Sequence, residues 1–244
     1  MKQLDRFLEH ARTPMILAIV IFLASIGLLH IFRSAEEQLQ ELDQAVAVAK
    51  LMADSSNDLT NFARYYVTTK DQQWKKAFDR VLQIRNGQEP DAHGTKQSFK
   101  DRVHAVGFVK AELDLILKAE TLSNNLAVLE IKAFESVARG REETVWDIQQ
   151  YHYTAAQLAM FGEDYNRYKT EIMTTVEQFR ESVYQRLQSE YAASMYQAWL
   201  LICVMNVALL LLVLVIQHRP SKSTAKPVPR KPLRAKTPRA TKTK

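Results

Sequence analysis

Cysteine, glycine and proline are scarce in this chain. Its 244 residues contain one cysteine, six glycines and seven prolines, and five of the prolines follow residue 219. The single cysteine, Cys203, excludes an intrachain disulfide. The shortage of glycine and proline before residue 219 argues against the many tight turns of a β-sandwich. The sequence therefore predicts an all-α protein.

Catalytic motifs are also missing. The six histidines are scattered, and the sequence contains no His-Glu-x-x-His, no Cys-x-x-Cys and no phosphate-binding loop. We therefore predict no catalytic residues, no metal site and no cofactor, and we do not expect the chain to be an enzyme.

Acidic residues are absent from the end of the chain. Residues 33–217 carry 20 lysines and arginines against 25 acidic residues, whereas residues 218–244 carry ten against none, so the net charge of +6 comes from this tail. The tail also lacks an apolar period and is predicted to be disordered. Its candidate contacts with anionic lipid or an acidic partner are Arg219, Lys222, Lys226, Arg230, Lys231 and Arg234. Nonspecific attraction to DNA and a plain topological anchor are the alternatives.

Two apolar runs are long enough to cross a bilayer. Residues 14–32 and 198–217 each supply about the twenty residues that a membrane-spanning helix needs. A signal peptide is the competing interpretation of the first run, but that run is long, lacks a clear cleavage site and is matched by a second run. Lysine and arginine favour the cytoplasmic side, so the basic residues in 1–13 and 218–244 place both termini in the cytoplasm. Residues 33–197 are then predicted to lie outside.

The sequence between the two runs has a helical period. The expected helices cover residues 34–69, 72–86, 98–106, 108–139, 141–161 and 163–217, of which the first and last continue the membrane helices. Asp71 is predicted to cap the second helix, residues 88–96 to form a loop, and Gly107 and Gly162 to mark breaks. The order of the long helices predicts an up-down four-helix bundle.

Three apolar stripes indicate the faces that these helices bury. The first is Leu39, Leu42, Val46, Ala49 and Ala53. The second has the four-three spacing of a bundle or coiled-coil seam and consists of Leu115, Ala119, Leu122, Leu126, Leu129 and Ala133. The third is Tyr165, Ile172, Val176, Phe179, Val183 and Leu187.

Three blocks of sequence carry a resemblance to a known family. The first is SSNDLTNFARYYVTTKD at 55–71, followed by Trp74 and by IRNG at 84–87; the second is AVGF at 105–108 with AETLSNNL at 119–126 and LEIKA at 129–133; the third is FGEDY at 161–165 with 169–172. In this order and spacing they resemble the extracytoplasmic sensor region of methyl-accepting chemotaxis proteins. Related sensors precede bacterial histidine kinases and diguanylate cyclases. The resemblance covers about residues 50–180.

The resemblance implies a bacterial inner-membrane protein with a periplasmic helical sensor that works as a parallel dimer. Two features depart from the family pattern. The loop after Gly87 lacks an aromatic-rich insert, which puts a shared ligand in doubt. The 27 residues after Gln217 are too few for a HAMP relay and a signalling domain. We therefore expect the signal to be read by a partner, in a homodimer or in a mixed dimer with a full-length receptor.

The candidate ligand-binding residues lie in the first of these blocks and just after it: Arg64, Tyr65, Tyr66, Trp74 and Arg85. An arginine can clamp a carboxylate, and the neighbouring aromatic rings can enclose the rest of a small anion or cation. In the alternative interpretation, the aromatic residues pack a turn between two helices, and the arginines pair with nearby aspartates on the surface.

Two classes of function remain open from the sequence. The first is a sensor that detects a periplasmic small molecule or protein and relays or modulates a signal through other membrane proteins. The second is a structural or scaffolding subunit that uses the helical bundle for protein–protein assembly. A tether for nucleic acid through the basic tail is a third possibility, which we rank below both.

Overall fold

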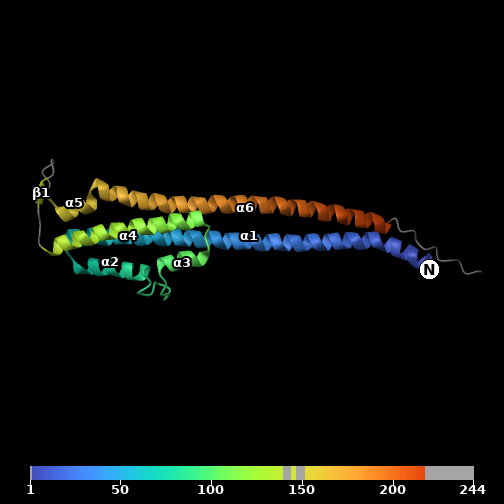
Figure 1. Ribbon diagram of the computed structural model, residues 1–244, viewed down its shortest axis with the longest axis horizontal. Helices are drawn as coiled ribbons and strands as arrows, with labels where there is room; N and C mark the ends of the chain where they lie inside the picture. The colour runs from blue at the N-terminus through green and yellow to red at the C-terminus, as the bar shows by residue number, and fades with distance from the viewer. Residues whose placement is uncertain (1, 140–143, 147–151, 218–244) are drawn as a thin grey trace, which may run out of the picture. The chain divides into compact units, whose positions relative to one another are not determined.

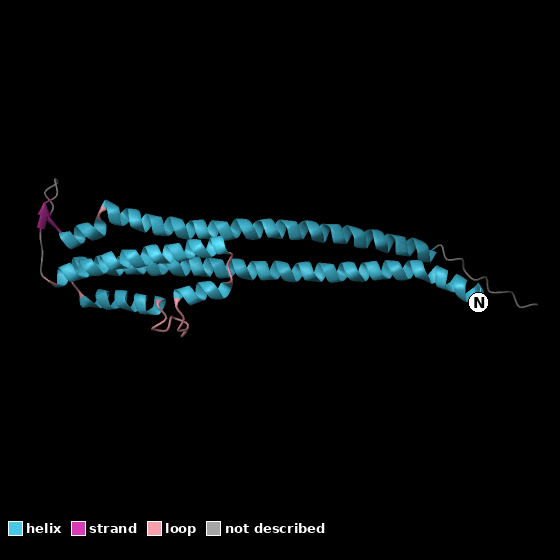
Figure 2. Cartoon of the chain, viewed as in Figure 1, coloured by secondary structure: helices cyan, strands magenta, loops and turns pink. Residues whose placement is uncertain are grey.

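The computed structural model describes residues 2–139, 144–146 and 152–217, and its order of elements is shown in Figure 1. The helices are α1 (Lys2–Thr69), α2 (Gln72–Arg85), α3 (Phe99–Val106), α4 (Lys110–Ala138), α5 (Ala155–Phe161) and α6 (Glu163–Gln217), and the strands are β1 (Thr144–Trp146) and β2 (His152–Thr154). The described residues are thus almost entirely helical, as predicted (Figure 2). The basic tail lies outside the described residues. So do its six candidate contact residues, Arg219, Lys222, Lys226, Arg230, Lys231 and Arg234.

Residues Ala24–Ile202 form one compact unit. In it α1, α4 and α6 are joined by side-chain contacts, and α2 and α3 lie along α1 and α4 (Figure 1). Its core is lined by large side chains that are fully enclosed, among them Phe78, Phe99, Phe179, Met52 and Ile172. Burying each such side chain contributes about 1.5–3 kcal/mol.

The predicted helix boundaries around α2 and α3 are confirmed. Lys70 adopts a left-handed φ of 60° after α1, and Asp71 caps α2 by accepting a hydrogen bond from the Gln73 backbone N–H at 2.9 Å. Gly107 ends α3 with a φ of 81°. These residues stop and start helices for local reasons, because an αL residue ends a helix and an aspartate satisfies a free N–H at its start.

The buried stripe of α6 is confirmed, because all six predicted residues, from Tyr165 to Leu187, are buried. For α4, three of the six residues predicted to be buried are wrong, and in each case the next residue along the chain is buried instead. Ala119, Leu126 and Ala133 are buried, but Leu129 is exposed and Leu115 and Leu122 are half-buried. The positions that complete the buried stripe are Glu112, Ile116, Ser123 and Glu130. Three of these four are polar, which is why an apolar period did not reveal them.

The stripe predicted for α1 also shifts. Leu39 and Val46 are exposed, whereas the neighbouring Ala45, Val48 and Met52 are buried. The buried face of the helix therefore contains fewer leucines than the sequence pattern suggested, although Ala49 is buried as predicted.

The prediction of a helix over residues 141–161 is confirmed for Ala155–Phe161 and wrong for residues 144–146 and 152–154. Thr144–Trp146 and His152–Thr154 pair as two antiparallel strands, and a helix begins only at Ala155; residues 140–143 and 147–151 lie outside the described part. The strands are rich in β-branched and aromatic residues, which favour extended backbone. Thr154 then forms a capping box with Gln157, in which each side chain accepts from the other residue's backbone N–H. The helical period of this stretch was therefore overridden by local β-propensity and a strong start signal.

Helices α1 and α6 each contain a segment long and apolar enough to cross a membrane. Most side chains of these segments are exposed rather than enclosed by the protein, including Phe22, Leu23, Val207 and Leu210. By length and composition the two helices are compatible with a two-span membrane protein.

Candidate functional site

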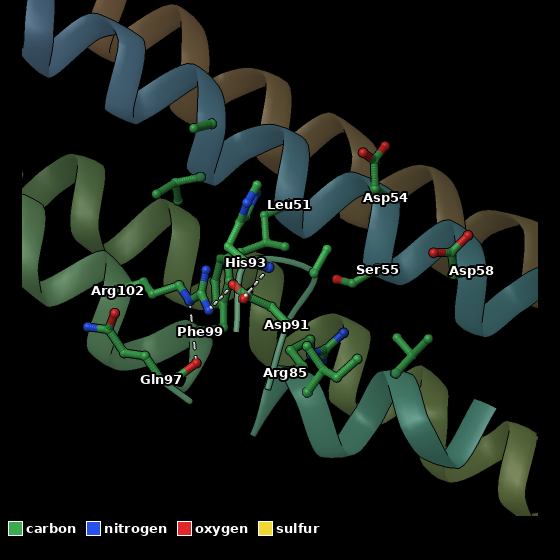
Figure 3. A pocket seen from close by; sticks show the side chains of 15 residues that line it. Leu51, Asp54, Ser55, Asp58, Arg85, Asp91, His93, Gln97, Phe99 and Arg102 are labelled. Carbon is green, nitrogen blue, oxygen red and sulfur yellow. Dashed lines mark hydrogen bonds and ion pairs between the residues drawn. The ribbon is translucent and has the colours of Figure 1, made fainter. Parts of the chain in front are cut away.

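A cavity of about 570 Å³ lies between α1, α2, α3 and the loop that joins the last two helices (Figure 3). Ligand sites in proteins commonly measure roughly 300–1,000 Å³. Its apolar lining comes from α1, α2 and α3 and includes Val48, Leu51, Val81, Ile84 and Phe99. Its ionisable lining consists of Asp54, Asp58, Arg85, Asp91, His93 and Arg102. Apolar walls with a few polar groups are what a small organic ligand requires.

The loop side of the cavity is built around Asp91. Its Oδ1 accepts from the backbone N–H groups of His93 and Thr95, both at 2.9 Å, and its Oδ2 accepts from Arg102 Nη2 at 2.6 Å. These bonds lower the pKa of Asp91 to about 2, and the bond from the Thr95 backbone N–H has the largest effect. At neutral pH the carboxylate therefore stays charged and holds both the loop and α3.

The loop also depends on Gly87, which has a φ of 73°. A Cβ at this position would lie 2.7 Å from the backbone nitrogen of Ser98, the residue that caps α3. The two ends of the loop therefore approach each other more closely than any side chain at residue 87 allows.

Replacement of Arg102 by glutamine is expected to raise the pKa of Asp91 while leaving it below the value of a free aspartate, because the backbone bonds remain. The carboxyl titration of ¹³C-labelled aspartate in the full chain measures this pKa by NMR. Arg80→Gln is the control, since Arg80 pairs instead with Glu89. The lowered pKa of Asp91 stabilises the fold above pH 4, and this contribution is lost as the pH falls towards 2. An unchanged Asp91 pKa in Arg102→Gln would contradict the role of the ion pair.

Arg85 lies at the boundary between the cavity and the core and is only 5% exposed. Its Nη1 donates to Ser123 Oγ at 2.9 Å, and its Nη2 donates to Asn124 Oδ1. Its Nε is buried and has no hydrogen-bond acceptor among the described residues. Burial lowers the pKa of Arg85 and the charges of Glu120 and Glu130 oppose that shift, but a guanidinium remains protonated at neutral pH.

Asp54 and Asp58 stand one turn apart on the face of α1 that lines the cavity (Figure 3). Neither has an ion-pair partner within 4 Å among the described residues. Burial and the neighbouring charge of Asp54 raise the pKa of Asp58, and Lys169 partly offsets this. Like charges at this spacing destabilise a helix, so the pair has a cost that the fold itself does not explain.

A second polar cluster lies in the core behind the cavity and joins α1, α4 and α6. Tyr165 donates its hydroxyl to Glu130, which is 1% exposed, and its oxygen lies 3.0 Å from Thr60 Oγ1. Lys169 Nζ donates to Ser56 Oγ at 2.9 Å. Burial raises the pKa of Glu130 and lowers the pKa of Lys169 to about 8, and the charge of Glu130 opposes the latter shift.

The five residues predicted to form one ligand site lie in three places. Tyr65 and Trp74 contact each other, with ring centroids 4.8 Å apart. Tyr66 is buried, with its ring edge-on to Phe134. The Tyr65–Trp74 contact packs α1 against α2 beside their turn, as the alternative interpretation predicted for Trp74, whereas the Tyr66 ring packs α1 against α4.

The two predicted arginines are separated. Arg64 donates to the Met160 carbonyl at 3.1 Å and to Asn166 Oδ1 at 2.9 Å, so it fastens the turn between α5 and α6 to α1. Arg85 is the one predicted site residue that lines the cavity. Neither arginine forms the predicted surface pair with Asp58, Asp71 or Asp79 within the described part of the chain.

The remaining ionisable residues of the cavity were not predicted. Asp54 and Asp58 carried a signal, since two aspartates four residues apart on a helix are unfavourable without a purpose. The contributions of Asp91, His93 and Arg102 carried none, because they depend on how the loop folds back onto α1.

No protein-family model, curated protein or solved structure matches this chain.

Proposed function

We propose that this chain is a non-enzymatic, sensor-like protein of the bacterial inner membrane, related in design to chemoreceptors. It crosses the membrane twice with both termini in the cytoplasm, and its periplasmic up-down four-helix domain detects a small molecule or a protein. It relays or modulates the signal through partner membrane proteins. The observation that carries the proposal is the cavity of about 570 Å³ whose wall includes α1.

Helix α1 supplies the physical link. The same helix, Lys2–Thr69, contains an apolar segment and the cavity residues Val48, Leu51, Asp54 and Asp58. A ligand shifts a conformational equilibrium only when it binds two arrangements with different affinity. A ligand that bridges α1 to the loop and α3 meets this condition, because its contacts change if α1 moves relative to them.

The proposed membrane orientation is based on the distribution of charge, and the proposed partner is based on an uncovered groove. The basic segments at both ends support cytoplasmic termini. A groove of about 560 Å³, lined by α1 and α6, contains Leu39, Leu42, Tyr184, Leu187 and Tyr191. Its lining is mainly apolar, and the buried Oε1 of Gln38 has no hydrogen-bond donor among the described residues. A second copy of the chain, or a full-length receptor, would cover this groove in a homodimer or mixed dimer.

The same groove is the observation that favours the alternative function, a scaffolding subunit. In that case the apolar groove supplies assembly and the cavity has no ligand. The two functions differ in what happens when the cavity is filled.

We expect one chemical class of small molecule to raise the melting temperature of the full chain in nanodiscs in a saturable way. The panel contains amines, organic acids, amino acids and purines. A ligand that binds only the native state stabilises it by mass action, by about 2.7 kcal/mol at a hundred times its Kd. Differential scanning fluorimetry measures the shift.

The variant that tests the site is Ala47→Trp, because Ala47 is exposed and lines the cavity. It should abolish the ligand-induced shift while leaving the unliganded protein folded. Ala111→Trp, at an exposed position of α4, is the matched control. A panel with no active class favours the scaffold, and a shift that survives in Ala47→Trp places the ligand elsewhere.

A further inference from the structure

The charged residues that line the cavity differ in whether they have partners within the protein. Asp91 and Arg102 form an ion pair at 2.6 Å. Arg85 is hydrogen-bonded to Ser123 and Asn124, and the carboxylates of Glu120 and Glu130 act on its charge. These three cavity groups therefore have partners within the protein.

Asp54 and Asp58 are the lining carboxylates without an ion-pair partner among the described residues. They project from consecutive turns of α1 at one side of the cavity, away from the Asp91–Arg102 pair (Figure 3). The unpaired carboxylates are therefore confined to one wall, while Arg85, at the boundary between the cavity and the core, is a cation without an ion-pair partner among the described residues. A cation placed against this wall removes the repulsion between the two aspartates and gains a Coulomb interaction with both.

The rest of the cavity limits what kind of cation fits. Val48, Leu51, Val81, Ile84 and Phe99 form apolar walls, on which a bare metal ion or a fully hydrated ion gains nothing. A volume of about 570 Å³ accommodates a body the size of a ring system with a side chain.

A second and independent feature points to a ligand at this place. Arg85, 5% exposed and lining the cavity, has a buried Nε–H without an acceptor among the described residues. A buried donor without an acceptor destabilises the folded state. This nitrogen is enclosed by the protein, so an oxygen on the ligand satisfies it where the wall around Arg85 opens on binding.

We propose that the cavity binds an organic amine: an ammonium group between Asp54 and Asp58, an apolar body against Leu51, Val81 and Phe99, and an oxygen acceptor that reaches Arg85. This inference rests on the proposed sensing function and names the ligand class of the same site. The loop held by Asp91 forms the opposite wall.

Three probes of one shape test the charge requirement: tyramine, the neutral tyrosol, and the anionic 3-(4-hydroxyphenyl)propanoate. They share the phenol ring and differ in the group at the end of the chain. With the full protein in nanodiscs, isothermal titration calorimetry should show saturable binding of tyramine and at least about tenfold weaker binding of the other two, equivalent to about 1.4 kcal/mol. Binding should weaken as salt rises, because the aspartates are exposed.

The paired substitution Asp54→Asn with Asp58→Asn should weaken tyramine binding by about tenfold or more. It removes a like-charge repulsion on an exposed helix face, so we expect it to fold at least as well as the wild type. Asp114→Asn, at an exposed position on α4 outside the cavity, is the control. Circular dichroism verifies that each variant is folded.

The possible outcomes distinguish failure of the amine inference from failure of the proposed sensing function. Preferential binding of the propanoate, or tyramine binding that the paired aspartate substitution leaves intact, overturns the amine inference. If no amine binds but another class in the broader panel binds in a way that Ala47→Trp blocks, the amine inference fails and the sensing function stands. If no class binds in that way, both fail.

Discussion

Replacing Arg186 by methionine is expected to lower the free energy of unfolding by about 3 kcal/mol or more. Arg186, on α6, donates to both carboxylate oxygens of Glu112 on α4, from Nε at 2.8 Å and from Nη2 at 3.1 Å. It also donates to Glu41 on α1 and, at 3.3 Å, to Glu190. The Glu112 side chain is 1% exposed. Removing one partner of a buried ion pair costs about 3–5 kcal/mol, because the other charge stays enclosed without compensation.

Chemical unfolding of the full chain in detergent, followed by circular dichroism, measures this change. Arg180→Met is the matched control. Arg180 forms an exposed pair with Glu177 at 2.6 Å, and such surface pairs contribute about 0–1 kcal/mol.

A second substitution distinguishes loss of the pair from loss of packing. Combining Arg186→Met with Glu112→Leu removes both charges and leaves an apolar contact, so the double variant should recover most of the lost stability. If Arg186→Met alone unfolds like the wild type, the ion pair does not hold the three helices together.

Arg186 also explains how a polar group can define the register of the core. Glu112 lies in the first turn of α4, where the helix dipole favours a negative charge. The guanidinium meets it there and reaches across to α1. One arginine thus fixes where α4 begins relative to α1 and α6, which apolar packing alone specifies less sharply because one leucine can replace another.

The sequence predicted the features of this fold that depend on local chemistry. The stop at Thr69, the cap at Asp71 and the break at Gly107 are each set by one residue and its immediate neighbours. The buried stripe of α6 was also predictable, because all its members from Tyr165 to Leu187 are apolar or aromatic and keep a helical spacing.

The sequence did not predict features that depend on contacts between distant segments. The core face of α4 contains Glu112, Ser123 and Glu130, whose partners are Arg186, Arg85 and Tyr165 on other helices. Without those partners a buried glutamate is unfavourable, so an apolar period selects the adjacent leucines instead. The cavity was unpredictable for the same reason, since its wall is assembled from three helices and a loop, and only Arg85 was singled out in advance.

The second large effect is expected from Tyr165→Phe, which should lower the free energy of unfolding by about 2–3 kcal/mol. The Tyr165 hydroxyl is the one hydrogen-bond donor to Glu130 among the described residues. A hydrogen bond to a charged group contributes about 1.5–3 kcal/mol, and its removal leaves the buried carboxylate with an unmet acceptor. Tyr168→Phe is the control, because Tyr168 is exposed and lies three residues further along the same helix. Equal stability of the two variants would contradict the buried bond.

The pKa of Lys169 provides a local measure of the same cluster. It is lowered to about 8 in the folded protein by burial, and Glu130 opposes that shift. Glu130→Gln should therefore lower it further, and NMR of ¹³C-labelled lysine in the full chain follows the titration. Because Lys169 binds its proton less tightly in the folded than in the unfolded state, its contribution makes stability rise as pH increases from about 8 towards 10, and this rise should extend to lower pH in Glu130→Gln. A Lys169 pKa that stays the same in Glu130→Gln would mean that the two groups are not coupled, and that the links between α4, α6 and α1 act separately.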